Sequence, residues 1–311
     1  MIEFQQVSRA YGKVKAVDNL NLTVMEGEIM VLLGSSGSGK TTSLKLVNRL
    51  IEATSGSIFF EQENILKHDP VQLRRKIGYV IQQVGLFPHM TVEGNIGTVP
   101  KLLNWPLQKI HARCIEMMKL INLDPLEYLS RLPDQLSGGQ KQRIGLARAL
   151  AADPPLVLMD EPFASLDPVN RKQLRSEFIQ ICRKLKKTII MVTHDIAEAI
   201  DIADKICLMH AGRAQQVGTV RDMLFQPAND FVSTFFENER ITFDLKVMNV
   251  QDLVPFIDFD VAHGDEAPVL RSDSVLEILT ANTSPSRFRL LNESFTISDL
   301  LSAYFRFRNT P

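Results

Sequence analysis

The stretch Gly34-Ser-Ser-Gly-Ser-Gly-Lys-Thr41 satisfies in full the sequence pattern G-x-x-x-x-G-K-[S/T]. It follows Ile29-Met-Val-Leu-Leu33, a continuous apolar run of the kind expected in a strand that is covered on both faces. Residues 41–51 then resume at helical spacing. The apolar residues on one face of this predicted helix are Leu44, Val47, Leu50 and Ile51. A strand, a glycine-rich turn and a helix in this order predict the opening of a β-α unit in an α/β fold.

Each residue type in this loop has a physical reason if the loop binds phosphate. Glycines let backbone N–H groups turn toward phosphate oxygens, and the following helix points the positive end of its dipole at them. Lys40 can reach the β- and γ-phosphates of a nucleotide, and the Thr41 hydroxyl can bind Mg²⁺. The loop therefore predicts nucleotide binding, but by itself it is compatible with many functions.

A second stretch, Leu156-Val-Leu-Met-Asp160-Glu161, narrows these functions. Four apolar residues that end in an acid place Asp160 at the carboxyl edge of the predicted sheet, where ligands of open α/β folds bind. Asp160 can hold the Mg²⁺ shell, and Glu161 can polarise an attacking water as a general base. A single acid after a strand is more often a simple cap. An adjacent pair downstream of a complete phosphate loop favours catalysis.

A third stretch, Leu136-Ser137-Gly138-Gly139-Gln140, begins a predicted helix over residues 137–151. The two glycines leave the amino end of this helix bare, which makes it a second anion site. On its own, Ser-Gly-Gly is also compatible with a mere cap and turn. Its place about twenty residues before Asp160, far from the phosphate loop in the chain, favours the anion site.

Composition excludes several classes of protein. The chain has 311 residues, of which 45% are hydrophobic, and its 35 Lys+Arg against 36 Asp+Glu give a net charge of -1. No charge excess recruits nucleic acid, no apolar run is long enough for a membrane helix, and Met1–Gln6 is not a signal peptide. Cys114, Cys182 and Cys207 have no metal-ligand spacing, so we expect buried reduced thiols. These features predict a soluble intracellular protein.

Charge changes along the chain near residue 240. Residues 1–240 carry 29 Lys+Arg and 26 Asp+Glu, whereas residues 241–311 carry 6 and 10. The second part holds seven of the 17 Phe, which a disordered extension would not need. We therefore predict a larger domain over 1–240, with a mostly helical insertion at about 83–155, and a small folded α+β module over 241–311.

Together, the three stretches resemble the ATP-binding cassette (ABC) family, the ATPase subunits of ABC transporters, over about residues 1–235. Residues 34–41 are similar to its Walker A loop, 136–140 to its LSGGQ signature and 156–160 to its Walker B strand, and Glu161 matches its catalytic glutamate. The resemblance implies a phosphate-loop NTPase core with a helical subdomain and an antiparallel β subdomain. The nucleotide contacts that these motifs imply are Gly34, Ser35, Ser36, Gly37, Ser38, Gly39, Lys40, Thr41, Thr42, Ser137, Gly138, Gly139 and Gln140.

Two aromatic or polar positions match the family more weakly. Tyr11 stands where the family stacks an aromatic residue on adenine; taken alone, it is equally a surface or strand tyrosine. Gln82 matches the glutamine that senses Mg²⁺ and the attacking water. We choose it over Gln83 because the family's glutamine precedes a hydrophobic run at the spacing of Leu86-Phe-Pro88.

Two later positions complete the resemblance. Ser165-Leu-Asp167 resembles the D-loop, which makes Asp167 a nucleotide contact. His194 matches the switch histidine; taken alone, it is more often a polar residue at a strand end, but a neutral imidazole there could donate a hydrogen bond to the γ-phosphate. The implied catalytic residues are Glu161, His194, Lys40 and Gln82, and the implied Mg²⁺ ligands are Thr41, Gln82 and Asp160.

The family's arrangement implies two copies that face head to tail. Each copy would enclose ATP between its own phosphate loop and the partner's Ser137–Gln140 helix end. The ATPase would work at the cytoplasmic face of the inner or plasma membrane, with separate permease subunits and, indirectly, a solute-binding protein. The family's docking surface corresponds to about residues 82–105. Trp105 either lines this docking surface or packs in the core, and the sequence favours neither alternative.

Other stretches resemble the subfamily that imports quaternary-amine osmoprotectants such as glycine betaine, choline and carnitine. They are Lys45–Glu52, Thr54–Gly56, Gly85–His89 and Thr193–Ala199. None of these residues would touch the solute. The alternatives are an importer of another small polar solute, an exporter cassette, or a soluble non-transport cassette.

Members of this subfamily often end in paired CBS modules. Val275, Ile278 and Leu279 suggest one helix, and residues 288–297 suggest a hairpin around Asn292-Glu293. Ser298 could cap a last helix whose inward residues would be Leu300, Leu301, Tyr304 and Phe305. This order is compatible with one degenerate CBS-like repeat that responds to ionic strength or nucleotide. A small module that stabilises a dimer is the alternative.

Overall fold

The computed structural model describes residues 1–82, 85–164, 168–257, 260–261, 275, 288–290 and 293–309. The chain divides into two compact units. The first unit comprises Met1–Met223 and Pro227–Val232, and the second comprises Leu224–Gln226 and Ser233–Pro311. The charge of the sequence changes near residue 240, whereas the contacts between residues divide the chain a few residues earlier, between Val232 and Ser233.

A six-stranded sheet with the order β10-β9-β3-β8-β7-β6 forms the centre of the first unit. Its strands are parallel except β10, which pairs antiparallel with β9. Every residue of β3, β7 and β8 is buried, because both faces of these strands are covered. The strands are β3 (Ile29–Leu33), β6 (Ile77–Val80), β7 (Leu156–Asp160), β8 (Thr188–Thr193), β9 (Lys205–His210) and β10 (Arg213–Gly218).

A second sheet is antiparallel, with the order β2-β1-β4-β5. Apolar residues of this sheet, such as Phe4, Leu22 and Phe60, share one core cluster with Met30 and Leu32 of β3. The predicted α/β core with an antiparallel β subdomain is therefore confirmed. The strands are β1 (Ile2–Tyr11), β2 (Val14–Val24), β4 (Ser55–Phe60) and β5 (Glu63–Asn64).

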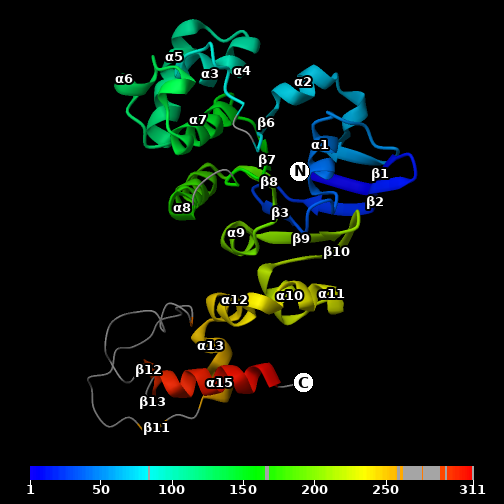
Figure 1. Ribbon diagram of the computed structural model, residues 1–311, viewed down its shortest axis with the longest axis vertical. Coiled ribbons are helices and arrows are strands. Elements are labelled where there is room, and N and C mark those ends of the chain that lie inside the picture. The colour runs from blue at the N-terminus through cyan, green and yellow to red at the C-terminus, as the bar shows by residue number, and fades with distance from the viewer. Residues whose placement is uncertain are drawn as a thin grey trace. The chain divides into compact units, whose positions relative to one another are not determined.

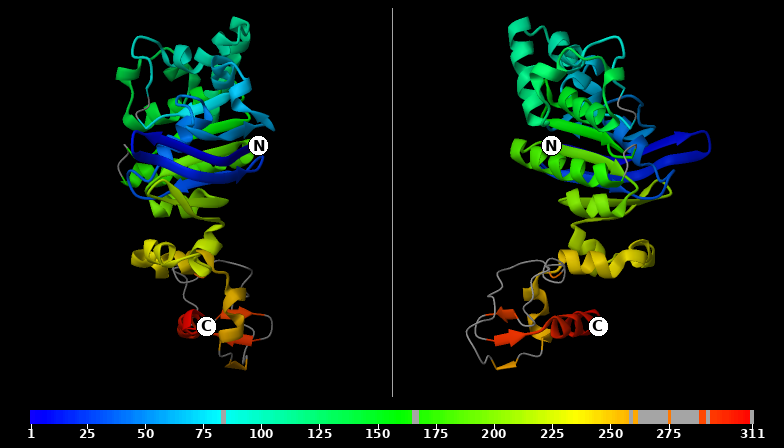
Figure 2. Two further views of the ribbon diagram at one scale, coloured as in Figure 1. Left: turned by 90° about the vertical axis from the view of Figure 1, so that its right-hand side faces the viewer. Right: turned by 60° about the vertical axis from the view of Figure 1, so that its left-hand side comes forward.

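Helices cover the six-stranded sheet on both faces. Helix α1 (Lys40–Val47) lies between the two sheets, and α8 (Pro168–Leu185) and α9 (Ile196–Ile202) lie on the other side (Figures 1 and 2). The prediction that the first helix runs to residue 51 was wrong. Arg49 has a left-handed backbone with φ of 52°, which ends the helix, and Leu50 is 47% exposed instead of packed.

In the described residues of the predicted helical insertion, five α-helices cluster at one end of the first unit (Figure 1, cyan to green). On α5, Ile110, Cys114 and Met117 are buried, at spacings of four and three residues that put them on one face of the helix. The helices are α3 (Val92–Ile96), α4 (Thr98–Leu102), α5 (Leu107–Leu120), α6 (Pro125–Tyr128) and α7 (Gly138–Leu150). Shorter or peripheral elements are α2 (Pro70–Arg75), α10 (Val220–Phe225), α11 (Asp230–Phe235) and the 3-10 turns Ile65–Lys67, Pro133–Gln135 and Glu237–Glu239.

The three cysteines are all buried, as predicted, and unpaired. Burial raises the pKa of the Cys114 and Cys207 thiols to about 12 and also raises the pKa of Cys182. Among the residues that the structure describes, no helix has the length and apolar character needed to cross a membrane.

The second unit has its own small core. A buried cluster of polar side chains ties its first helix to its last: Asp244 accepts hydrogen bonds from Tyr304 at 3.0 Å and from Arg308 at 2.6 Å. Burial raises the pKa of Asp244, although Arg308 opposes this effect. The elements are α12 (Arg240–Val247), α13 (Val250–Leu253), the 3-10 turn Val254–Phe256, β11 (Asp260–Val261), β12 (Phe288–Leu290), β13 (Glu293–Phe295) and α15 (Ile297–Asn309).

Strands β12 and β13 pair antiparallel, as the sequence predicts for this hairpin. Two details of the prediction for the last helix were wrong. Thr296, and not Ser298, caps α15, because Thr296 Oγ1 accepts a hydrogen bond from the Asp299 N–H. Leu301 and Phe305 are exposed rather than inward. The helix predicted around Val275 lies outside the described residues, except for Val275 itself.

Candidate functional site

The loop between β3 and α1 is tightly enclosed at two of its glycines. Gly34 has φ of 153° and Gly39 has φ of 102°. A Cβ atom at Gly34 would lie 2.2 Å from the Met209 carbonyl oxygen, and one at Gly39 would lie 2.3 Å from the Ala16 carbonyl oxygen. Because no side chain fits at either position, the loop backbone can follow the narrow path between β9 and β2 only with glycine there.

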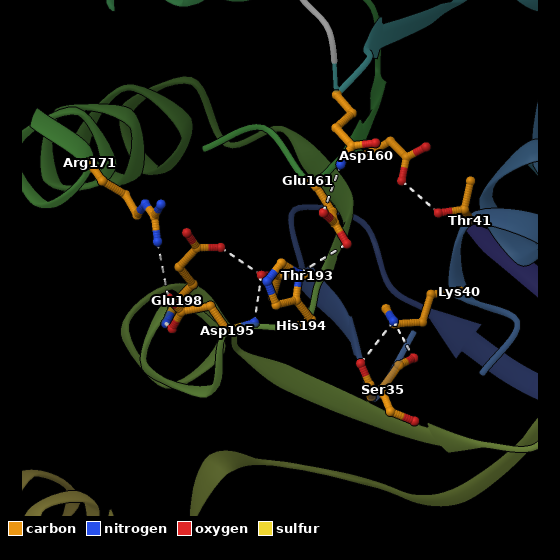
Figure 3. Close-up of polar contacts among 12 residues, drawn as sticks. Ser35, Lys40, Thr41, Asp160, Glu161, Arg171, Thr193, His194, Asp195 and Glu198 are labelled. Atoms are coloured by element: carbon orange, nitrogen blue, oxygen red, sulfur yellow. Dashed lines mark hydrogen bonds and ion pairs between the residues drawn. The ribbon is translucent and has the colours of Figure 1, made fainter. Parts of the chain in front are cut away.

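Lys40 lies folded over this loop (Figure 3). Its Nζ donates hydrogen bonds to the carbonyl oxygens of Gly34 and Ser35, both at 2.8 Å. The side chain is buried, and desolvation lowers the pKa of its ammonium group, although Glu161 and Asp160 nearby oppose this effect. The loop therefore concentrates a positive charge in a partly dry environment, where an anion would bind it strongly.

Ser38 adds an unsatisfied donor to the loop. It is 2% exposed, and its Oγ has no hydrogen-bond partner among the residues that the structure describes. A buried hydroxyl without a partner costs free energy, on the order of 1–3 kcal/mol, unless a ligand or water binds it. Ser35, Ser36 and Gly37 are exposed in the same loop, and Thr42 lies half-buried on α1.

Thr41 and Asp160 meet at the edge of the sheet. The Thr41 hydroxyl donates a hydrogen bond of 2.8 Å to Asp160 Oδ1. Asp160 is the last residue of β7, and burial raises the pKa of its carboxyl group, although the Thr41 hydroxyl opposes the shift. A hydroxyl and a carboxylate oxygen side by side form the all-oxygen donor set that a hard cation such as Mg²⁺ prefers. The residues present fit that ion.

Glu161 is held between two other predicted residues. Gln82 Nε2 donates to Glu161 Oε2 at 3.0 Å. On the other side, His194 Nδ1 lies 3.1 Å from Glu161 Oε1 (Figure 3). The backbone of Glu161 is left-handed, with φ of 45°, and its N–H donates to the Val192 carbonyl at 3.0 Å. This conformation costs a side-chain-bearing residue about 1–3 kcal/mol, and such strain is typical of functional sites.

The structure thus brings together Lys40, Thr41, Asp160, Glu161, Gln82 and His194 at one edge of one sheet. These residues come from the ends of β3, β6, β7 and β8 or from the segments that follow them. Parallel strands end at the same edge, so residues far apart in sequence become neighbours there.

The Ser137 segment is a separate feature of the same unit. Ser137 caps α7: its Oγ accepts from the Gln140 N–H at 3.3 Å, and Gln140 Oε1 accepts from the Ser137 N–H at 2.8 Å. A Cβ atom at Gly138 or Gly139 would meet nothing within 4 Å, so packing within the chain does not require these glycines. Among the described residues, no hydrogen bond joins this helix end to the loop at residues 34–41.

Two predicted nucleotide contacts, Tyr11 and Asp167, are not among the residues that the structure brings together at the sheet edge. Tyr11 ends β1 and is 50% exposed, with the Arg9 guanidinium 4.5 Å from the centre of its ring. Asp167 lies outside the described residues, together with the rest of the predicted D-loop.

Sequence reasoning missed a group of polar residues behind His194. Thr193 and Glu198 are both buried, and the Thr193 hydroxyl donates to Glu198 Oε2 at 2.6 Å (Figure 3). The signal available in the sequence was a glutamate four residues after His194, on a short helix that also carries Ala199, Ile200 and Ile202. An acid at a position expected to face the sheet is unusual enough to mark a polar contact.

The fold and the site define the class of protein. The chain belongs to the ABC transporter family: residues 17–164 match the family's profile, and relatives that are about half identical match over most of their length. The resemblance predicted from the motifs is therefore confirmed. Members of this family bind ATP.

Relatives from Bacillus subtilis (strain 168) include OpuCA and OpuBA. The glycine betaine/carnitine/choline transport ATP-binding protein OpuCA is 55% identical over 242 residues, 78% of this chain and 63% of OpuCA. The choline transport ATP-binding protein OpuBA is 48% identical over 291 residues, 91% of this chain and 76% of OpuBA. The chain thus spans less than two thirds of the length of OpuCA.

A solved structure with the same fold is the ATP-binding cassette MJ0796, a dimer in a post-hydrolysis state bound to ADP and Pi. It is 31% identical, with a TM-score of 0.62, and the match covers 70% of this chain and 98% of that one.

Proposed function

We propose that the chain is the ATP-binding and ATP-hydrolysing subunit of an ABC importer for a quaternary-amine osmoprotectant such as glycine betaine or choline. The observation that carries the proposal is the geometry around Glu161: a carboxylate oriented by Gln82 and His194, beside the Thr41–Asp160 pair. The solute class is supported by the transport functions that the names of OpuCA and OpuBA give.

The loop would bind the triphosphate of ATP. The loop and the amino end of α1 follow β3 at the carboxyl edge of the sheet, where their backbone N–H groups could bind phosphate oxygens. Lys40 can exchange its two loop carbonyl partners for β- and γ-phosphate oxygens. Ser38 Oγ would gain the partner that it lacks. Tyr11 would contact the adenine from the end of β1.

Thr41 and Asp160 would hold Mg²⁺ with ATP, and Gln82 would reach the ion from the segment after β6. When bound, the ion neutralises charge on the phosphate oxygens. Glu161 would accept a proton from the attacking water as the water oxygen bonds to the γ-phosphorus and ADP leaves. Gln82 orients that carboxylate through its Nε2–H. A neutral His194 either donates its Nδ1–H to the carboxylate or, in the other tautomer, donates from its second ring nitrogen to the γ-phosphate.

A second copy of the chain would complete the site. Within one chain the α7 amino end is capped but its glycines face open space, which leaves room for the phosphates of a nucleotide held by a partner. The dimeric state of the MJ0796 cassette supports this arrangement. Closure around two ATP and reopening after hydrolysis would supply the mechanical step, because ATP binds the closed dimer better.

Permease subunits would dock on the stretch over residues 82–105. A cavity of about 320 Å³ lies between this stretch, α2 and α7, lined by Phe87, Val99 and Arg148 among others. Its charged lining residues are all arginines (Arg74, Arg75 and Arg148), so it suits an apolar segment that carries a carboxylate. We therefore propose that the subunit works at the cytoplasmic face of the membrane, beside its permease.

Replacing Glu161 with Gln should stop hydrolysis without preventing nucleotide binding. Loss of a general base lowers turnover by about 10²–10⁴-fold. With ATP and Mg²⁺, Glu161→Gln should accumulate as a dimer, detected by light scattering, while phosphate release falls. The exposed Glu26→Gln serves as the matched control and should behave as wild type. Phosphate release at the wild-type rate by Glu161→Gln would remove the general-base assignment.

A bulky side chain at residue 138 should block the dimer but not the fold. Gly138→Leu meets no atom within 4 Å in the single chain, and leucine is a better helix former than glycine by up to about 1 kcal/mol. We expect an unchanged or higher urea midpoint and normal ATP binding by the monomer. In the Glu161→Gln background, however, the ATP-dependent dimer should be lost. Persistence of that dimer would contradict the proposed contact.

Photo-crosslinking tests the docking surface. A benzophenone amino acid in place of Phe87, which is 41% exposed, should form an adduct with a multi-spanning membrane protein in native membranes. The same probe in place of Val14, 68% exposed on the antiparallel sheet, is the control and should not. Adducts with soluble proteins alone would count against permease docking at this cavity.

Uptake assays test the solute. Deletion of the gene should abolish ATP-dependent uptake of radiolabelled glycine betaine or choline, and the wild-type chain, but not Glu161→Gln, should restore it. Unchanged uptake of both compounds would remove the solute assignment. Co-purified proteins separate the alternatives: a permease with a solute-binding protein indicates an importer, a permease alone an exporter, and neither a non-transport cassette.

A further inference from the structure

We propose that Thr193 and Glu198 act as positioning residues for His194: the hydrogen bond between them fixes the turn that presents the His194 ring to Glu161. The proposal deepens the function proposed above and rests on it only for its kinetic consequence. The positioning itself concerns the protein without nucleotide, so it can be tested apart from ATP hydrolysis.

Three hydrogen bonds join Thr193, Asp195 and Glu198 in a closed hydrogen-bonded ring beside His194 (Figure 3). Thr193 Oγ1 donates to Glu198 Oε2 at 2.6 Å and accepts from the Asp195 N–H at 3.0 Å. Asp195 Oδ1 accepts from the Glu198 N–H at 3.0 Å, which caps α9. Both sequence neighbours of His194 are therefore held by hydrogen bonds, which restricts the backbone from which the His194 side chain extends.

Two residues of this hydrogen-bonded ring, Thr193 and Glu198, are buried, whereas His194 is not. Thr193 is 2% and Glu198 3% exposed, but the His194 side chain is 61% exposed. Among the described residues, its one polar contact is with Glu161, at 3.1 Å. A single contact at a largely solvated ring does not hold an imidazole in place. The rigidity of the turn must then supply the orientation.

A carboxylate buried at position 198 has a free-energy cost, because it loses contact with water. Desolvation raises the pKa of the Glu198 carboxyl group; the Thr193 hydroxyl, Arg175 and Arg171 oppose the shift, and Asp195 adds to it. An apolar residue would pack beside Ala199 and Ile200 without that cost. What the acid adds is a short, directional hydrogen bond to the residue that precedes His194.

Helix α8 supports the same turn. Arg171 Nη1 lies 3.8 Å from Asp195 Oδ2, so a residue in the first turn of α8 faces the cap of α9. Arg175, one turn further along, forms an ion pair with Asp201 on α9. The turn that carries His194 is therefore anchored from β8, α9 and α8 together.

Two matched pairs of variants test the proposal in the full-length protein. Thr193→Val removes the hydroxyl but keeps the shape of the side chain, whereas Thr193→Ser keeps the hydroxyl. Glu198→Ala removes the hydrogen-bond acceptor, whereas Glu198→Gln keeps an acceptor oxygen. We expect Thr193→Val and Glu198→Ala to lower kcat for ATP hydrolysis about 10–100-fold, the loss typical of a slightly misplaced catalytic group, with KM changed less than about twofold. Thr193→Ser and Glu198→Gln should recover most of kcat.

A double-mutant cycle separates positioning from general stabilisation. In a His194→Ala background, Glu198→Ala should cost no further kcat, because the residue that it positions is gone. An equal loss with and without His194 would overturn the proposal.

A spectroscopic measurement does not depend on hydrolysis. In protein labelled with ¹⁵N-histidine, the His194 imidazole signal, assigned with His194→Ala, should shift or broaden in Thr193→Val and match wild type in Thr193→Ser. An unchanged signal in Thr193→Val would overturn the positioning role. If the signal responds but the wild-type chain hydrolyses no ATP, the proposed function fails and the positioning stands.

Discussion

Parallel pairing of β3, β7 and β8 is the constraint on which the site depends. In the ladder, Leu33 pairs with Thr193, and Asp160 pairs with Val192. The three strands therefore end level with one another, and the residues that follow them emerge side by side. Segments separated by more than a hundred residues in sequence meet within hydrogen-bond distance because the sheet registers them.

Several departures from what local chemistry prefers lie at the same edge. Within the described part of the chain, Lys40 is buried with only loop carbonyls as hydrogen-bond partners, and the Ser38 hydroxyl has no partner. Asp160 is a buried carboxyl group. Glu161 has a left-handed backbone. Elsewhere in the first unit, apolar residues fill the cores as their patterns predict. Strain and unsatisfied polar groups gathered at one place are expected where a ligand completes the structure.

The sequence predicts the parts of the site that lie in continuous motifs. Lys40 and Asp160 each follow a buried apolar strand, so their place at the sheet edge could be derived before the structure was known, and His194 could be placed by resemblance. Leu50 was misplaced because helical spacing continues past the left-handed residue that ends α1. Glu198 was missed because its partner is fixed by the turn of the chain between β8 and α9, which periodicity does not describe.

The burial of all three thiols has a practical consequence for chemistry on this protein. A thiol reacts with maleimides and iodoacetamides as the thiolate, and native thiols that are shielded and have a pKa near 12 remain protonated and inert at neutral pH. A cysteine introduced on the surface would then be the sole nucleophile of its kind. Spin labels, fluorophores or bifunctional reagents could be attached at one chosen position in the otherwise natural sequence.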